Sequence, residues 1–107
     1  MTIKKIQKLG KVIEELATVD PEFPMQWALV FQDIALNEGA SLRDISERTG
    51  ISMSVMSRTI GALSNYRRMG KPYGLVLVKN AKHDRRVKEL YLSKKGQKLA
   101  EKISKIL

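Results

Sequence analysis

The feature of this sequence with the clearest chemistry is a run of cations between residues 66 and 88. Residues 66–88 hold eight lysines and arginines against one acid, Asp84, so this segment alone carries +7 of the chain's net +9. The eight cations are Arg67, Arg68, Lys71, Lys79, Lys82, Arg85, Arg86 and Lys88. Guanidinium and ammonium groups bind phosphate oxygens, so this cluster is typical of a nucleic-acid-binding protein. The alternative is a solvated basic surface without a ligand.

The residue types that catalysis and metal binding require are scarce. The chain has no cysteine and a single histidine, His83, which excludes disulfides, thiolate metal sites and imidazole clusters. The sequence offers no nucleophile paired with a base, and Asp44 and Glu47 are explained by helix capping and by solvent. We therefore expect a protein that is not an enzyme and binds neither a cofactor nor a metal.

Apolar periodicity places the cations after a set of helices. Residues spaced three and four apart predict helices over about 2–18, 25–37 and 42–49, a fourth from Ser52 to about Ser64, and a last one that begins at Ser93. Two β-rich runs, 75–78 and 87–92, flank a polar turn over 79–86 and predict a hairpin. The expected fold is mainly α with a small β-hairpin (α+β), ordered α-α-α-α-β-β-α, in a single domain over 1–107.

The third and fourth helices have the pattern of a helix-turn-helix. Ser41 and Asp44 are spaced as a capping box, and Gly50 lies where the tight turn between crossing helices needs a positive φ. The residues expected to face the core are Ile51, Met56, Ile60 and Leu63. The outward residues of the fourth helix are Met53, Ser54, Ser57, Arg58, Gly61 and Asn65. Most of these are small or hydrogen-bonding, as expected for a helix that enters a DNA major groove.

The composition is that of a soluble globular protein, with 43% apolar and 29% charged residues. The sequence has no apolar run near the roughly 18 residues of a membrane span, and charges replace the apolar core of a signal peptide. We expect a cytoplasmic protein that associates with the nucleoid when it binds DNA.

With these motifs the sequence resembles the MarR-type winged helix-turn-helix transcriptional regulators, as a short variant covering about residues 25–96. The matching elements are Trp27, Ile51–Ile60 with Leu63, Gly74-Leu75-Val76, Asp84-Arg85-Arg86, Leu90-Tyr91-Leu92-Ser93 and Lys95-Gly96. The wing motif is fairly specific, whereas the helix-turn-helix is common to many DNA-binding folds. The resemblance implies that the fourth helix reads the major groove and that the hairpin, or wing, reaches the adjacent minor groove.

The expected DNA-binding residues come from this resemblance and from the cation pattern. They are Ser41, Ser52, Met53, Ser54, Ser57, Arg58, Asn65, Arg67, Arg68, Lys71, Lys82, His83, Arg85 and Arg86. Ser54, Ser57 and Arg58 would meet bases or phosphates. Arg85 or Arg86 would meet the backbone, and the alternative for Arg86 is a pair with Asp84 that holds the wing rigid.

Three features depart from the family pattern. The wing has Ala81 and His83 where relatives often carry Asp and Arg, which leaves Lys82 and His83 to replace them in part. The connection over 64–73 is longer and more basic than usual, and it either extends the fourth helix or forms a loop that grips phosphate. The chain ends at Leu107, where relatives commonly continue with a longer dimerisation helix, so the resemblance leaves a small-molecule ligand open.

The terminal helices, about 2–18 and 93–107, have more apolar surface than one small domain requires. The expected dimer interface consists of Ile6, Leu9, Ile13, Leu16, Leu99, Ile103 and Ile106. A two-fold axis would place two recognition helices roughly 34 to 36 Å apart on successive major grooves and would favour a palindromic site. The alternative is that the two apolar stripes pack on each other within one chain.

Together these features predict a sequence-specific double-stranded DNA-binding regulator, a homodimeric repressor that occludes a promoter. The alternative is a winged helix used as an accessory or protein-interaction module in replication or partition. RNA binding is less favoured, because Tyr66 and Tyr73 are the only candidate aromatic platforms for stacked bases. A membrane-surface role for the first helix is disfavoured by Glu14 and Glu15.

Overall fold

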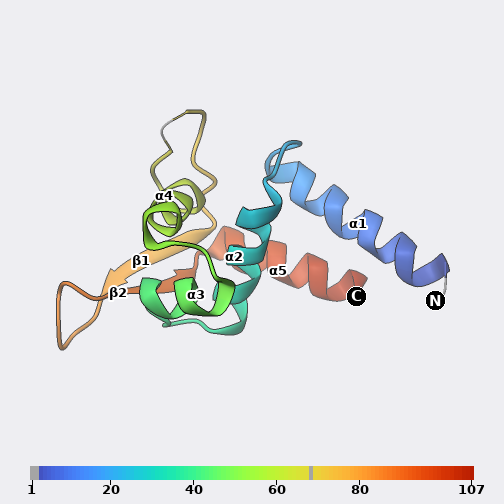
Figure 1. The fold of residues 1–107 in the computed structure, drawn as a ribbon. Helices are drawn as coiled ribbons and strands as arrows, with labels where there is room; N and C mark the ends of the chain where they lie inside the picture. Colours follow the sequence, from blue (N-terminus) through green and yellow to red (C-terminus); the bar gives the residue numbers. More distant parts are fainter. Residues whose placement is uncertain (1–2, 68) are drawn as a thin grey trace.

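Five helices and one β-hairpin make up residues 3–67 and 69–107, the part of the chain that the computed structural model describes (Figure 1). The helices α1 (Ile3–Val19), α2 (Met25–Leu36), α3 (Leu42–Thr49) and α4 (Met53–Leu63) come first. The strands β1 (Val76–Asn80) and β2 (Lys88–Leu92) follow, and α5 (Lys94–Ile106) comes last. The predicted order α-α-α-α-β-β-α and the mainly α class with a small β-hairpin are therefore confirmed.

The core lies where α2, α3 and α4 meet the hairpin and α5. The largest side chains with almost no exposed surface include Val30, Ile34, Ile45, Met56, Leu63, Leu75 and Leu90. The four residues predicted to face the core from the helix-turn-helix are all buried: Ile51, Met56, Ile60 and Leu63. Because α4 buries this face, its opposite face points outwards.

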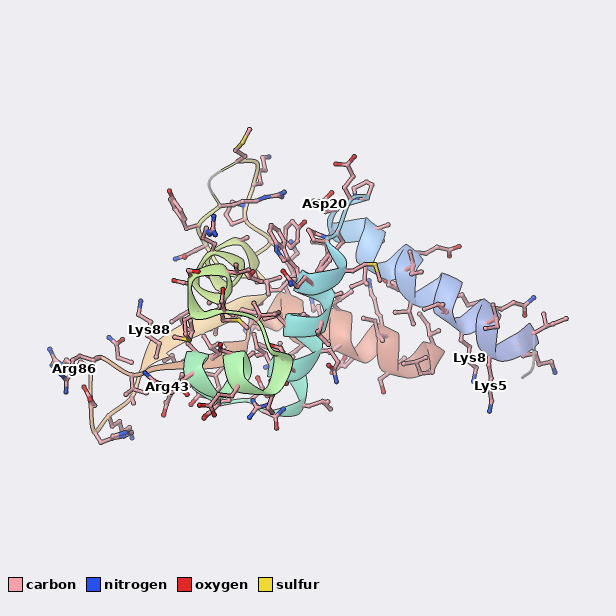
Figure 2. All side chains as sticks on the ribbon, in the orientation of Figure 1. Lys5, Lys8, Asp20, Arg43, Arg86 and Lys88 are labelled. Atoms are coloured by element: carbon pink, nitrogen blue, oxygen red, sulfur yellow. The ribbon has the colours of Figure 1, made fainter. Side chains whose placement is uncertain are left out.

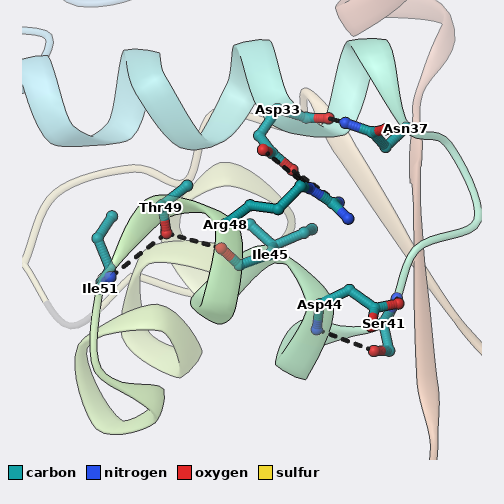
Figure 3. Close-up of polar contacts among 8 residues, drawn as sticks. All are labelled: Asp33, Asn37, Ser41, Asp44, Ile45, Arg48, Thr49 and Ile51. Atoms are coloured by element: carbon teal, nitrogen blue, oxygen red, sulfur yellow. Dashed lines mark hydrogen bonds and ion pairs between the residues drawn. The ribbon is translucent and has the colours of Figure 1, made fainter.

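Local caps fix α3 and the turn into α4 (Figure 3). The Asp44 N–H donates to the Ser41 hydroxyl, and the Ser41 N–H donates to the Asp44 carboxylate, which is the predicted capping box. Gly50 has a φ of 75°, the predicted left-handed conformation that glycine adopts without steric cost. Arg48 forms an ion pair at 2.9 Å with Asp33, which ties α3 to α2.

The strands begin and end at different residues from those predicted, and Leu75, predicted in the first strand, precedes β1. β1 and β2 pair antiparallel along all their residues, and Lys79 and Asn80, which were predicted in the turn, belong to β1. Val87, predicted in the second strand, instead precedes β2. The reason is that Ala81 is buried and its N–H donates to the Val87 carbonyl at 2.8 Å. This hydrogen bond closes the turn just beyond the last strand pair, Asn80 and Lys88.

The connection between α4 and β1 is a loop, which decides between the two forms left open by the sequence (Figure 1). The chain leaves α4 at its C-cap, Ser64, and later runs back past the end of the same helix. On return, the Tyr73 N–H donates to the Ala62 carbonyl at 2.8 Å and the Leu75 N–H donates to the Leu63 carbonyl at 2.7 Å. These bonds satisfy carbonyls that the end of a helix leaves without partners. Arg68 lies outside the described residues.

The terminal helices α1 and α5 pack against each other and extend in the same direction away from the hairpin (Figure 1). The predicted dimer residue Leu99 is 5% exposed in the single chain and belongs to its core, which corrects that assignment. The physical reason is that α5 packs on β2, which places Leu99 in the core of the single chain. Ile6, Leu9 and Ile13 of α1 remain about half exposed, at 52%, 56% and 54%.

The first turn of α5 lies so close to the hairpin that Gly96 has no room for a side chain. A Cβ there would overlap the carbonyl oxygen of Leu75, a main-chain atom. We therefore predict that Gly96→Ala lowers the free energy of unfolding by about 1 to 3 kcal/mol, as measured by urea denaturation. Gly10→Ala is the matched control, because Gly10 of α1 has open space around it. Gly10→Ala should raise the free energy of unfolding by up to about 1 kcal/mol. Equal changes in the free energy of unfolding for the two variants would contradict the prediction.

Candidate nucleic-acid interface

The outward face of α4 presents the side chains predicted to read bases. Ser54, Ser57 and Arg58 are exposed, and Met53 in the first turn is 45% exposed. Within residues 3–67 and 69–107, Arg58 has no acidic partner at ion-pair distance. These side chains are therefore free to contact a ligand.

Two serines of the predicted interface are engaged in helix caps. Ser41 is half-buried, and its hydroxyl accepts from the Asp44 N–H. Ser52 is exposed, and its hydroxyl accepts from the Val55 N–H at 3.4 Å while lying 3.3 Å from the Ser54 hydroxyl. The role of Ser41 is thus structural, whereas Ser52 lies at the exposed start of α4.

A cleft of about 570 Å³ separates α4 from the hairpin. Its hairpin side is formed by Val78, Asn80, Arg86 and Lys88, and its α4 side includes Met53, Ser57, Gly61 and Asn65. Amide, hydroxyl and cationic groups of this kind bind phosphate and sugar oxygens. Asn80 and Lys88 were not among the predicted site residues, because only the pairing register of the strands brings them to the cleft.

The basic end of the molecule lies opposite the free ends of the terminal helices. Figure 2 shows Arg86 and Lys88 on the hairpin, with Arg43 of α3 near its base, and Lys5 and Lys8 of α1 at the other end. Arg43 is exposed and was also absent from the predicted site. Nothing in the sequence marked Arg43, because it lies in α3 and most of the excess cations follow residue 66.

The carboxylate of Asp84 organises the turn of the hairpin. It accepts from the Arg86 N–H at 2.9 Å and from Arg86 Nε at 3.2 Å. These hydrogen bonds, the backbone one foremost, hold the pKa of Asp84 below its ordinary value. Arg86 thus adopts the predicted pairing with Asp84, and Lys82, His83 and Arg85 are exposed around it.

Arg67, predicted to bind phosphate, directs its guanidinium towards other parts of the protein. Its Nη1 lies 3.5 Å from Asp20 Oδ2, and its Cζ lies 5.0 Å from the centre of the Trp27 ring. The Tyr73 hydroxyl donates to the same Asp20 oxygen, and the Tyr73 ring packs against Phe23. We name the set of Asp20, Trp27, Arg67 and Tyr73 the Asp20 clasp. It ties the 65–73 loop to the corner between α1 and α2, a connection that the sequence did not reveal.

The part of the chain that the structure describes contains no group of three or more His, Asp or Glu side chains that could hold a metal ion. Among the same residues, no helix combines the length and the apolar character needed to cross a membrane.

The fold has clear relatives among solved structures, although no protein-family model and no curated protein matches the sequence. The DNA complex of MepR from S. aureus matches with a TM-score of 0.74 at 18% identity, over 95% of this chain and 74% of MepR. The MarR repressor of Listeria monocytogenes matches with a TM-score of 0.65 at 24% identity, over 94% of this chain and 62% of that chain.

A third match is the PcaV transcriptional regulator of Streptomyces coelicolor in complex with its natural ligand. Its TM-score is 0.65 at 19% identity, and the match covers 78% of this chain and 54% of PcaV. This chain therefore spans about half the length of that regulator. The three similarities establish a shared winged helix-turn-helix fold.

The Asp20 clasp generates a prediction about stability at alkaline pH. Burial, together with the hydrogen bond to Asp20, raises the pKa of Tyr73 to about 12, and the bond from Tyr73 lowers the pKa of Asp20. The raised tyrosine pKa stabilises the folded state below about pH 10, the pKa of an unfolded tyrosine, and this contribution is lost as the pH rises towards 12.

Tyr73→Phe should therefore lose less stability than the wild-type protein between pH 10 and 12, although it is less stable at pH 7. Urea denaturation of both proteins across this range measures the difference. If the free energy of unfolding changes with pH equally in the two proteins, Tyr73 has the same pKa in the folded and the unfolded chain, and the prediction is wrong.

Proposed function

We propose that this chain, whose fold is the winged helix-turn-helix of the MarR-type regulators, is a sequence-specific double-stranded DNA-binding transcriptional regulator. The observation that supports this most directly is the exposed face of α4 beside a cleft lined by polar and cationic groups of the hairpin. A protein with this function would be cytoplasmic and would associate with the nucleoid when bound to DNA.

In this proposal α4 enters the major groove of the duplex. The short side chains of Ser54 and Ser57 let the helix approach the base edges closely, and their hydroxyls can hydrogen-bond to any of them. Arg58 can donate two hydrogen bonds to a guanine, and Met53 can pack on the methyl group of a thymine. The sequence preference then resides in the first two turns of α4.

The hairpin contributes contacts outside the groove that α4 occupies. Lys82, His83 and Arg85 are exposed at its turn, where they can reach the adjacent minor groove or its phosphates. Lys88 lines the cleft against α4 and is placed to bind the phosphate backbone between the two grooves. The bond between Asp84 and Arg86 keeps the turn in one conformation, which lowers the entropic cost of binding.

The terminal helices support a homodimer. A groove of about 610 Å³ lies between α1, α2 and α5, and apolar side chains that include Leu16, Phe31 and Ile103 line it. Together with the half-exposed stripe of α1, this groove gives a second copy apolar surface to cover. Two recognition helices related by a two-fold axis favour a palindromic site, and bound dimers would repress by occluding a promoter.

Selection of bound duplexes from a random pool tests the proposed function, and we expect it to enrich a palindrome. On the selected site, Arg58→Ala should weaken binding by roughly 1 to 3 kcal/mol and relax the preference at one base pair, as measured by fluorescence anisotropy. Lys5→Ala removes the same charge at the other end of the molecule and should have little effect (Figure 2).

Two outcomes would contradict this proposal. A protein that binds no duplex even at low salt is not a DNA-binding regulator, and the protein-interaction alternative then takes its place. An Arg58→Ala protein with the wild-type base preference would remove Arg58 from base recognition.

The dimer has its own test in size-exclusion chromatography with light scattering. We expect a dimer at micromolar concentration and a monomer for Ile6→Glu, because the charge would be buried in the interface. Met25→Glu is the matched control: Met25 is 89% exposed at the start of α2 and lies outside the apolar groove. A wild-type monomer at this concentration rules out the proposed assembly.

A further inference from the structure

Two grooves flank α4, and only one of them involves the hairpin. The second has a volume of about 750 Å³ and is lined by Trp27, Arg58, Ala62, Tyr66, Arg67 and Met69. Ser57 and Gly61 line both grooves, so the exposed edge of α4 is the ridge between them. Figure 1 shows α4 nearly end-on, with the hairpin on one side and the 65–73 loop on another.

The 65–73 loop is anchored at both of its ends. The N–H of Tyr66 donates to the Gly61 carbonyl and the N–H of Tyr73 donates to the Ala62 carbonyl, both at 2.8 Å. A side chain at position 61 would press on the loop, since a Cβ there would lie 3.0 Å from the Tyr66 carbonyl oxygen. The Asp20 clasp and a hydrogen bond from Lys95 Nζ to the Tyr73 carbonyl at 2.8 Å hold the far end.

Two large side chains between these anchors, Tyr66 and Met69, face solvent. Tyr66 is 69% exposed and Met69 is 80% exposed, although both are large and partly apolar. Arg58 lines this groove and not the hairpin cleft, so its positive charge lies on the loop side of α4. This second groove, which we call the loop groove, therefore combines the cation of Arg58 with the phenol of Tyr66 and the apolar side chain of Met69. This chemistry fits a sugar-phosphate strand, because a tyrosine hydroxyl can bind phosphate and the apolar groups can pack on deoxyribose.

We propose that the 65–73 loop is a second wing, which contacts the DNA strand that borders the major groove on the side away from the hairpin. This rests on the proposed function, in which α4 occupies that groove. The B-DNA major groove is roughly 12 Å wide and has one strand on each side, so a helix within it faces a backbone on both flanks. The hairpin cleft receives one strand, and the loop groove receives the other.

This assignment gives Arg67 a different role from the one that the sequence predicts. Its guanidinium pairs with Asp20 and stacks near Trp27, so it positions the loop. The contact with DNA falls to the exposed side chains of the loop, Tyr66 and Met69.

A charge placed at Met69 tests the proposal without disturbing the core, because this side chain is among the most exposed. Met69→Glu should weaken binding to all duplexes alike, by roughly fivefold or more at 50 mM salt, through repulsion of the phosphates. Met69→Lys should add about one phosphate contact, so its affinity should fall about three- to fourfold more than that of the wild type between 50 and 200 mM salt. Gln7→Glu and Gln7→Lys, at an exposed position of α1, are the matched controls and should behave as the wild type.

Interference by ethylated phosphates identifies the strand. With the wild-type protein, ethylation should interfere on both strands that border the half-site, and with Met69→Glu only on the strand next to the hairpin. If the wild type binds duplex DNA and both Met69 variants keep its affinity, salt dependence and interference pattern, the second wing is overturned while the proposed function stands. If the wild type binds no duplex, the proposed function fails and this inference fails with it.

Discussion

The burial of one face of α4 determines where the candidate ligand-binding groups of this protein lie. Met56, Ile60 and Leu63 are inserted into the core, and truncating a buried side chain of this size typically costs about 2 to 5 kcal/mol. Side chains repeat every 3.6 residues along a helix, so burying this face directs Ser57 and Arg58 into solvent. The face that meets a ligand is thus set by packing on the opposite side. The hairpin is positioned by the same core, through Leu75 and Leu90.

The path of the chain after α4 depends on a residue from the other end of the fold. Asp20 follows the C-terminal end of α1, where the helix dipole disfavours a negative charge. The hydrogen bond from Tyr73, the one from the Glu22 N–H and the ion pair with Arg67 offset this cost, and in that order they lower the pKa of Asp20. The contacts from Tyr73 and Arg67 hold the 65–73 loop against the corner of α1 and α2. The end of α1 and the loop that follows α4 are therefore joined by a polar cluster as well as by the apolar core.

The cations of residues 66–88 divide into two groups by their partners. Arg67 pairs with Asp20, and its side chain is 26% exposed, so it mainly holds a loop in place. Arg86 pairs with Asp84, but its side chain is 91% exposed and lines the cleft beside α4. Lys82, Arg85 and Lys88 are exposed on the hairpin. All of them contribute to the long-range attraction of a polyanion, because that depends on net charge. Close contacts depend on which groups are free, and the charge count alone does not distinguish the two groups.

The order of elements, the Ser41 cap, the Gly50 turn and the outward face of α4 were all determined by the sequence, because each depends on residues a few positions apart. The form of the 65–73 loop, the partner of Arg67, the second groove beside α4 and the burial of Leu99 were decided only by the tertiary structure. Asp20 and Tyr73, for example, are 53 positions apart, and nothing local to either marks the other as its partner. Periodicity and capping report the preferences of a segment for helix, strand or turn. They carry no record of which distant segment will supply a hydrogen bond or cover a side chain, because such partners become neighbours only when the core forms.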